Sequence, residues 1–260
     1  MTKKYKLTTK TKRYGDITLY RIECVTAFAD VVKGELGGWI EGESNLAQTG
    51  GAWVYGEAQV FGEARVFGNA KVSGEAEVFG KARVSGKAGV SGKARVFGEA
   101  GVFGEAGVFG KARVSGKAEV SGKAWVCVEA EVFGEARVFG NAWVSGKAWV
   151  SGKARVSGKA RVYGEARVYD EARVYDEARV SGKALVCGEA QVSGNALTLL
   201  GLRYPVTVTD THMAIGCQCH PKAFWRGVTE EEIKAIDGTV SASKFIEMRP
   251  ALLLLMRATD

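Results

Sequence analysis

Residues 132–144 read VFGEARVFGNAWV, a stretch that contains two consecutive six-residue units of the form V-x-G-x-A-x. Valine occupies every sixth position over 54–192, and alanine occupies every sixth position over 52–196. Glycine fills the other recurrent position with three exceptions, which are Val128, Asp170 and Asp176. Because only the valine and alanine series are unbroken over about two dozen units, these two positions are predicted to form the interior.

A period of six does not suit an α-helix. Residues six apart advance by about 600° around a helix of 3.6 residues per turn, so the valines would not share one face. A glycine in every unit would also cost a helix about 1 kcal/mol. A short strand that turns a corner at each glycine accommodates the pattern, and three such strands close a triangular coil of about 18 residues. The predicted fold class is all-β, a parallel β-helix or triangular β-solenoid.

One corner of this coil provides a test of the 18-residue period. Charges alternate along it at 18-residue steps, in the order Glu63, Lys81, Glu99, Lys117, Glu135, Lys153 and Glu171. Equivalent residues of stacked coils lie about 4.8 Å apart, so opposite charges would follow one another along that edge. Each exposed pair would contribute roughly 0.2 to 1 kcal/mol. Duplication of a 36-residue block would give the same pattern, so both origins stay open.

An uncovered end of a solenoid presents unpaired strand edges, so both ends are expected to carry a cap. Residues 1–38 are interpreted as an N-terminal β cap that contains a hairpin around Gly15 and Asp16. Residues 39–200 are assigned to the solenoid. Residues 201–260 are assigned to a small α+β unit, which serves either as a cap or as an oligomerisation element.

The C-terminal unit mixes strand and helix signals. Residues 206–216 alternate like a pair of strands. Thr229 and Glu232 have the spacing of a capping box, which predicts a helix from there to Ile236. Residues 241–259 predict a second helix that is interrupted at Pro250, because proline lacks a backbone N–H donor.

Composition and charge limit the possible functions. The chain is 46% hydrophobic and 25% charged, within the globular range, and its formal net charge is +7, most of it in the repeats. This bias permits attraction to nucleic acid or other anions but is modest for a dedicated nucleic-acid binder. Five cysteines without disulfide-rich spacing, no signal-peptide pattern and no apolar run of membrane-spanning length predict a cytoplasmic protein without membrane association.

The hexads carry a family resemblance. Val54-Tyr-Gly-Glu-Ala58-Gln resembles the units of left-handed β-helices in hexapeptide-repeat proteins. Gly37-Gly-Trp-Ile40, with Gly68-Asn-Ala70 and Gly140-Asn-Ala142, is similar to YdcK-like, polymer-forming repeat proteins of enterobacteria and of phages or prophages. Ile215-Gly-Cys-Gln-Cys-His220 is similar to a segment of phage-encoded proteins. The resemblance implies a left-handed coil and, by family analogy, a homo-oligomer such as a trimer. It implies no known activity.

Catalytic residues are not expected in the repeats. Hexapeptide-repeat acyltransferases use a histidine near a coil face, often beside an extended loop, and related carbonic anhydrases hold a metal with three histidines. Both histidines of this chain, His212 and His220, lie outside the repeats, and no loop interrupts the strict hexads. We therefore assign no catalytic residue and no cofactor, and acyl transfer is the least favoured alternative.

A cluster of soft ligands lies in the C-terminal unit. Four candidate zinc ligands fall within nine residues, namely His212, Cys217, Cys219 and His220. Their C-x-C-H spacing differs from the paired C-x-x-C of most structural zinc sites. Cysteine in a small unit is also often buried as an ordinary apolar residue. Both interpretations stay open.

The outward position before each valine carries the candidate binding residues. At 18-residue steps one row reads Trp53, Lys71, Gly89, Gly107, Trp125, Trp143, Arg161 and Arg179, and Trp149 lies on the next face. Exposed tryptophan beside arginine is typical of a protein interface, and glycine on a strand face can mark the close approach of another backbone. The predicted partner-binding residues are Trp125, Trp143, Trp149, Gly89, Gly107, Arg161 and Arg179.

The composition of these rows is open to two further interpretations. The near-identical hexads could record recent duplication, with tryptophan and arginine merely suiting a β surface. Alternatively, arginine rows that include Arg137, Arg155 and Arg173 could clamp phosphates, although corner residues such as Glu135 and Glu171 would partly neutralise them. The function predicted first is a non-enzymatic, phage- or prophage-encoded scaffold that binds a protein partner, for example as an inhibitor of a host protein. The alternative is a binder that sequesters an anionic ligand or nucleic acid.

Overall fold

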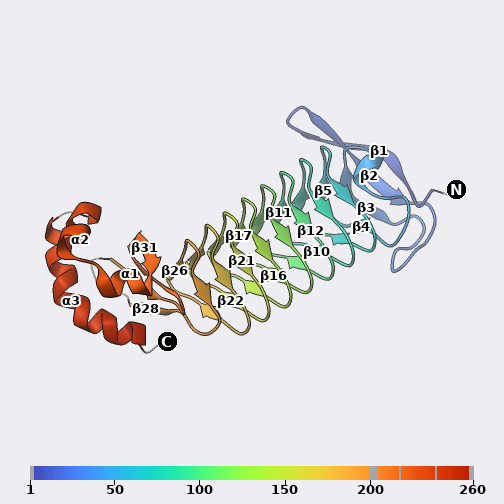
Figure 1. The fold of residues 1–260 in the computed structure, drawn as a ribbon. Coiled ribbons are helices and arrows are strands. Elements are labelled where there is room, and N and C mark those ends of the chain that lie inside the picture. Colours follow the sequence, from blue (N-terminus) through green and yellow to red (C-terminus); the bar gives the residue numbers. More distant parts are fainter. Residues whose placement is uncertain (1–2, 200–203, 217, 238, 258–260) are drawn as a thin grey trace.

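The computed structural model describes residues 3–199, 204–216, 218–237 and 239–257. Figure 1 shows an elongated solenoid with a β hairpin at the N-terminal end and a helical unit at the C-terminal end. Each hexad contributes one two-residue strand that contains its valine, and strands 18 residues apart pair in parallel. The predicted 18-residue β-solenoid is therefore confirmed.

The coils present three faces, each of them a parallel sheet. The first face contains β4 (Trp53–Val54), β7 (Lys71–Val72), β10 (Gly89–Val90), β13 (Gly107–Val108), β16 (Trp125–Val126), β19 (Trp143–Val144), β22 (Arg161–Val162) and β25 (Arg179–Val180). The second contains β5 (Gln59–Val60), β8 (Glu77–Val78), β11 (Arg95–Val96), β14 (Arg113–Val114), β17 (Glu131–Val132), β20 (Trp149–Val150), β23 (Arg167–Val168) and β26 (Leu185–Val186). The third contains β6 (Arg65–Val66), β9 (Arg83–Val84), β12 (Gly101–Val102), β15 (Glu119–Val120), β18 (Arg137–Val138), β21 (Arg155–Val156), β24 (Arg173–Val174) and β27 (Gln191–Val192).

The interior consists of the two unbroken residue series. Every repeat valine over 54–192 and every repeat alanine over 52–190 is at most 1% exposed, and all belong to one continuous core. Burial of a valine contributes on the order of 1.5 to 3 kcal/mol, but ordering its backbone costs a similar amount, so stability is shared along the array. Backbone bonds join the coils: for example, the Trp125 N–H donates to the Ala142 carbonyl at 2.9 Å.

The corners account for the glycine series. Repeat glycines over 56–188 adopt φ of 59–74°, which L-residues with a side chain rarely take. A Cβ on Gly98 would also lie 3.0 Å from the backbone nitrogen of Gly116 in the next coil. Three of the repeat corners have this conformation at a residue other than glycine: Val128 (φ 67°), Asp170 (φ 58°) and Asp176 (φ 54°). Valine is the least suited of the three because its Cβ is branched.

The corner charges pair only in part. On the edge with alternating charges, Lys153 and Glu171 form an ion pair at 3.3 Å. Its other oppositely charged neighbours, all of which lie in the described array, form no ion pair within 4.0 Å. Pairs do form on the other two edges, such as Lys159 with Glu177 at 2.8 Å and Lys111 with Glu129 at 3.3 Å. Exposed pairs gain little free energy, so alternation along an edge does not ensure contact.

The N-terminal segment extends the second face. The hairpin predicted around Gly15 is confirmed by β1 (Tyr5–Tyr14) and β2 (Ile17–Cys24), which pair antiparallel. β3 (Leu36–Ile40) pairs antiparallel with β2 and parallel with β5, and the 3₁₀ turn η1 (Glu43–Asn45) follows. Trp53 is fully buried against Tyr5 and Phe28. Lys4 donates to the Ala52 carbonyl at 2.8 Å, and burial lowers the pKa of this ammonium to about 8.

The described residues of the C-terminal unit form a four-stranded antiparallel sheet and three helices. The elements are β28 (Leu197–Leu199), β29 (Val206–Val208), β30 (His212–Ile215), β31 (Gln218–Pro221), α1 (Lys222–Gly227), α2 (Glu230–Asp237) and α3 (Thr239–Arg257). The predicted capping box forms, since Thr229 and Glu232 exchange side-chain to backbone hydrogen bonds at 2.8 and 3.2 Å. The interruption predicted at Pro250 is wrong. The helix continues because Phe245, Leu252 and Met256 on both sides of the proline pack into one core.

This unit covers the last coil of the solenoid. The Leu185 N–H donates to Thr207 Oγ1 at 3.0 Å, and the Gln191 N–H donates to Thr211 Oγ1 at 2.9 Å. Asp210 accepts from the Ser193 N–H at 2.6 Å. Hydroxyl and carboxylate oxygens thus accept from backbone N–H groups of the last coil, which would pair with carbonyls if a further coil followed. Within the described part of the chain, no helix is long and apolar enough to cross a membrane.

Replacing Val128 by glycine is expected to stabilise the protein. The side chain is 55% exposed, so little burial is lost, and relief of the left-handed conformation is worth about 1 kcal/mol after the entropy cost of glycine. Thermal unfolding followed by circular dichroism should show a higher melting temperature for Val128→Gly. The control is Asp176→Gly, which should gain less because aspartate tolerates this conformation. Equal gains, or a loss in Val128→Gly, would contradict the assignment of strain to this valine.

Candidate functional site

The row of outward residues predicted at 18-residue steps from Trp53 lies along the first face. Trp125 pairs with Gly107 on one side and with Trp143 on the other, and Trp143 in turn pairs with Arg161. Trp53, at the start of the row, lies beneath the N-terminal cap and does not contribute to the surface. The exposed part of the row therefore begins further along the solenoid.

The two exposed indoles of this row support each other. Trp125 is 45% exposed and Trp143 is 42% exposed, with ring centroids 5.6 Å apart. Phe109 packs edge-on against Trp125 at 5.5 Å. The Trp143 Nε1–H donates to Cys127 Sγ at 3.1 Å, while burial raises the pKa of the Cys127 thiol. Both indoles are thus held in place before any partner arrives, which lowers the entropy cost of binding.

Two arginines follow the tryptophans on the same face. Arg161 pairs in register with Arg179, so their outward side chains occupy adjacent rungs. Together with Trp143, Ser145 and Tyr163 they line a hollow of about 240 Å³. We name the residues Trp125, Trp143, Tyr163, Arg161 and Arg179 the tryptophan–arginine face.

The two glycines of the same row, Gly89 and Gly107, are explained by contact with a side chain of this chain. Gly107 is buried, and a Cβ at this position would lie 2.1 Å from Cζ of Phe109. The Phe109 ring also passes over Gly89, where a Cβ would be 3.7 Å away. Glycine therefore makes room for a ring of the same chain. This contact removes Gly107 from the exposed surface, although the sequence placed it among the partner-binding residues.

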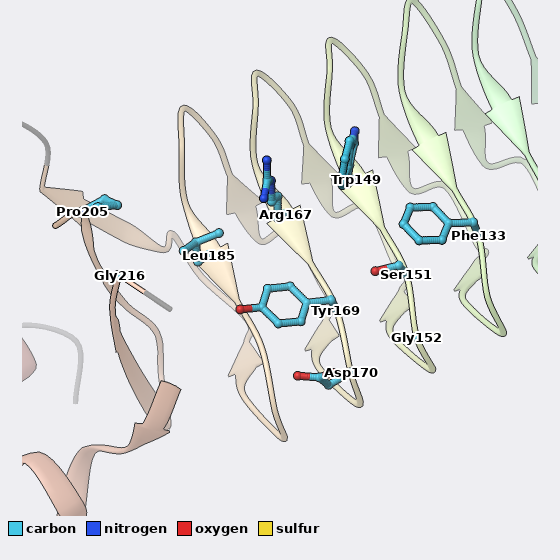
Figure 2. A pocket seen from close by; sticks show the side chains of 10 residues that line it. All are labelled: Phe133, Trp149, Ser151, Gly152, Arg167, Tyr169, Asp170, Leu185, Pro205 and Gly216. Carbon is cyan, nitrogen blue, oxygen red and sulfur yellow. The ribbon is translucent and has the colours of Figure 1, made fainter. Parts of the chain in front are cut away.

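Trp149 lies on the second face, as predicted, and is 40% exposed. The Arg167 guanidinium lies 4.7 Å from the Trp149 ring centroid, a cation–π contact. Figure 2 shows both side chains at the edge of a cleft of about 460 Å³, between the last coils and the C-terminal sheet. Sequence reasoning missed Arg167, although it belongs to an uninterrupted run of A-R-V hexads.

Arginines differ in their pairing along the solenoid. Two arginines of the second face meet carboxylates one coil away: Arg95 with Glu77 at 2.9 Å, and Arg113 with Glu131 at 3.3 Å. Arg65 and Arg83 pair in register on the third face, and neither has a carboxylate within 4.0 Å among the described residues. Five later arginines occupy successive hexads, namely Arg155, Arg161, Arg167, Arg173 and Arg179. Among the residues that the structure describes, none of these five has a carboxylate within 4.0 Å. The longest run of arginines without a described carboxylate partner therefore lies near the C-terminal end.

The candidate zinc ligands are held by other contacts. Cys219 donates to the Cys187 carbonyl at 3.1 Å, and the His220 ring lies 4.2 Å from Phe224. His212 Nδ1 is 2.9 Å from the Thr211 hydroxyl. The described residues contain no group of three or more histidine, cysteine or acidic side chains placed to hold a metal. Cys217 lies outside the described residues.

The fold and this surface define a β-solenoid repeat protein with an aromatic and cationic exterior. Residues 136–152 match the family model described as the YdcK beta solenoid repeat. The matched segment holds β18, β19 and β20, one strand from each face, so it samples a whole coil. The chain is a β-solenoid repeat protein, and this short match agrees with the YdcK-like resemblance found in its hexads. A search among curated proteins gave no match to the chain.

Stability of the C-terminal unit is expected to fall at mildly acidic pH. Burial lowers the pKa of both His212 and His220 below the usual value near 6.5. As the pH falls through 6.5, the unfolded chain binds protons that the folded chain does not, so stability present above pH 6.5 is progressively lost. Melting followed at 222 nm, which reports the helices, should shift to lower temperature from pH 7.5 to pH 5.5.

The matched variant for this measurement is His212→Gln, His220→Phe. Phenylalanine suits the ring cluster that His220 forms with Phe224 and Trp225. The variant should show a smaller shift than the wild-type protein over the same pH range. If both proteins shift equally, groups other than these histidines govern the pH dependence.

Proposed function

We propose that this protein is a non-enzymatic scaffold whose tryptophan–arginine face binds an acidic surface of a protein partner. The observation that carries the proposal is the exposed Trp125 and Trp143 pair, held by intramolecular contacts beside Arg161 and Arg179, which have no carboxylate partner among the described residues. Tryptophan and arginine are the residues most enriched at binding hot spots.

The remaining features support a binding role. The face is a continuous parallel sheet, so its side chains keep a fixed spacing, and rigid aromatic anchors lose little entropy on binding. The arginines of this face favour an acidic partner and would speed its association. Both histidines belong to the C-terminal unit, outside the repeat hexads, so acyl transfer stays the least favoured function.

The proposal extends to the setting in which the protein acts. Its resemblance to enterobacterial and phage proteins suggests a phage- or prophage-encoded accessory protein that works in the cytoplasm, for example by occupying a host protein. The family analogy suggests self-association, with a trimer as the first expectation. In that case a second copy of the chain is itself the partner.

Alanine substitution of both tryptophans should abolish partner binding. In co-purification from bacterial lysate, Trp125→Ala, Trp143→Ala should recover at least tenfold less partner than wild type, since a hot-spot residue contributes about 2 kcal/mol or more. The control is Phe139→Ala, Tyr175→Ala, which removes two rings from the third face. Sedimentation of the purified variants tests self-association in parallel. Identical partner profiles and oligomeric states in wild type and the tryptophan variant would show that this face is not the binding surface.

A second function is favoured by one specific observation. Arg155 pairs in register with Arg173, and Arg161 pairs with Arg179, so like charges occupy adjacent rungs on two faces. Like charges opposite one another on a sheet destabilise it unless an anion lies between them. We therefore propose, as the alternative, that these arginines sequester an anionic ligand or single-stranded nucleic acid.

Calorimetry with a short single-stranded DNA tests this alternative. Phosphate contacts predict that affinity decreases with salt, with a slope of log K against log salt of about −0.7 for each contact. Arg161→Gln, Arg179→Gln should lower both affinity and slope. The control, Arg95→Gln, Arg113→Gln, removes the same charge from arginines that already have carboxylate partners. Absence of heat at low salt would exclude the nucleic-acid function.

A further inference from the structure

The second face changes character along its length. In its first coils, the residues after the valines form a stack of parallel rings, with Phe61, Phe79 and Phe97 separated by 5.0 Å at each step. The Arg95 guanidinium lies 5.1 Å from the Phe79 ring and pairs with Glu77. This part of the face is therefore filled by its own rings, and its positive charge is neutralised.

Further along, the same row of residues has gaps. At 18-residue steps it continues as Ser115, Phe133, Ser151 and Tyr169. Ser151 is thus a small side chain between two aromatic ones, and Figure 2 shows the space that it leaves. The cleft of about 460 Å³ opens there, with Trp149, Leu185 and Pro205 among its other lining residues. We name this the junction cleft.

The gap has the dimensions of one aromatic ring. Phe133 and Tyr169 are two coils apart, so their rungs are separated by about 9.6 Å, twice the spacing between strands. A ring inserted midway would lie about 4.8 Å from each neighbour, within the range of favourable aromatic pairs. Such a ring would continue the spacing that the phenylalanine stack already shows. The cleft therefore suits an aromatic side chain supplied from outside.

The cleft also has one cationic group, Arg167, without an ion-pair partner among the described residues. Arg167 contacts the face of Trp149, and no described carboxylate lies within 4.0 Å of its guanidinium. Asp170, at the edge, is the acidic residue of the lining, and its carboxylate accepts from the Gly188 N–H at 3.2 Å. The Tyr169 hydroxyl is engaged with Cys187, and burial raises the pKa of Tyr169. Arg167 is therefore the group that would meet a ligand's charge, and it selects a carboxylate.

We propose that the junction cleft binds a peptide segment of the protein partner in which an acidic residue adjoins an aromatic one. The carboxylate pairs with Arg167, and the ring occupies the gap over Ser151 between Phe133 and Tyr169. This inference rests on the proposed function in that the partner is a protein. It does not depend on the tryptophan–arginine face, because the cleft lies on a different sheet.

The experiment uses the full chain labelled with 5-fluorotryptophan and a capped dipeptide, acetyl-Glu-Phe-amide. The fluorine resonance of Trp149 is assigned from the Trp149→Phe variant and followed during titration. We expect a saturable shift of this resonance. Acetyl-Gln-Phe-amide and acetyl-Glu-Ala-amide, which lack the charge or the ring, should each bind at least about fivefold more weakly. Equal binding by all three dipeptides, or no saturable shift, would overturn the proposal.

Two variants test the two halves of the cleft. Ser151→Phe should fill the gap and abolish the shift, whereas Ser115→Phe, the same change 36 residues earlier in the same row, should not. Arg167→Gln should weaken binding at least about fivefold, whereas Arg113→Gln should leave it unchanged, because Arg113 pairs with Glu131 on the same face. Melting curves confirm that each variant folds. Unchanged binding in both Ser151→Phe and Arg167→Gln would place the dipeptide elsewhere.

The dipeptide titration and the co-purification experiment test the cleft and the tryptophan–arginine face separately. The dipeptides need no native partner, so loss of dipeptide binding would overturn the cleft and leave the co-purification result for Trp125 and Trp143 standing. Conversely, partner recovery that is insensitive to the first-face substitutions, with saturable dipeptide binding, would overturn the first face alone.

Discussion

Hydrogen bonds from each coil to the next make every residue a neighbour of the residues 18 positions before and after it. This register allows a two-residue strand, too short to persist alone, to join a sheet of eight or more. It also turns a six-residue sequence pattern into three rows of identical environments. The left-handed corners support the register, since most repeat glycines lie close to the corner of the next coil: a Cβ on Gly98 would lie 3.0 Å from the backbone nitrogen of Gly116.

Surface chemistry follows from the same register. A residue type repeated every 18 positions becomes a row, and a change of type along that row becomes a boundary on the surface. Near the N-terminal cap, the second face has rings stacked on rings, and its Arg95 is paired with Glu77, so these contacts are satisfied internally. Closer to the C-terminal unit, Arg161 and Arg167 meet no such carboxylate within the described chain, and Trp143 stays exposed. The scaffold is uniform, whereas the longest run of arginines without a described carboxylate partner lies towards one end.

The interior and the rows could be predicted from the sequence because they depend only on periodicity. The hairpin around Gly15 and the capping box at Thr229 are local signals and were also predictable. Periodicity does not reveal how a side chain bends across a face, so the ring of Phe109 over Gly107 was missed. The junction cleft depends on Pro205 and Gly216 folding back onto the last coils, a contact between two units that share no repeat. Continuation of α3 through Pro250 likewise depends on tertiary packing that overrides a local rule.

In the described part of the chain, the hydrogen bonds and ring contacts of each cap named above lie on the coils beside it. Thr207, Asp210 and Thr211 hold the last coils, and Tyr5 and Phe28 cover the residues at the start of the array. Whole coils between them could be added or deleted without disturbing either end, each step changing the length by about 4.8 Å. The number of coils therefore sets the distance between the two caps in fixed steps. Duplication or deletion of three hexads would change the distance between the two ends by one coil and leave the residues at each end unchanged.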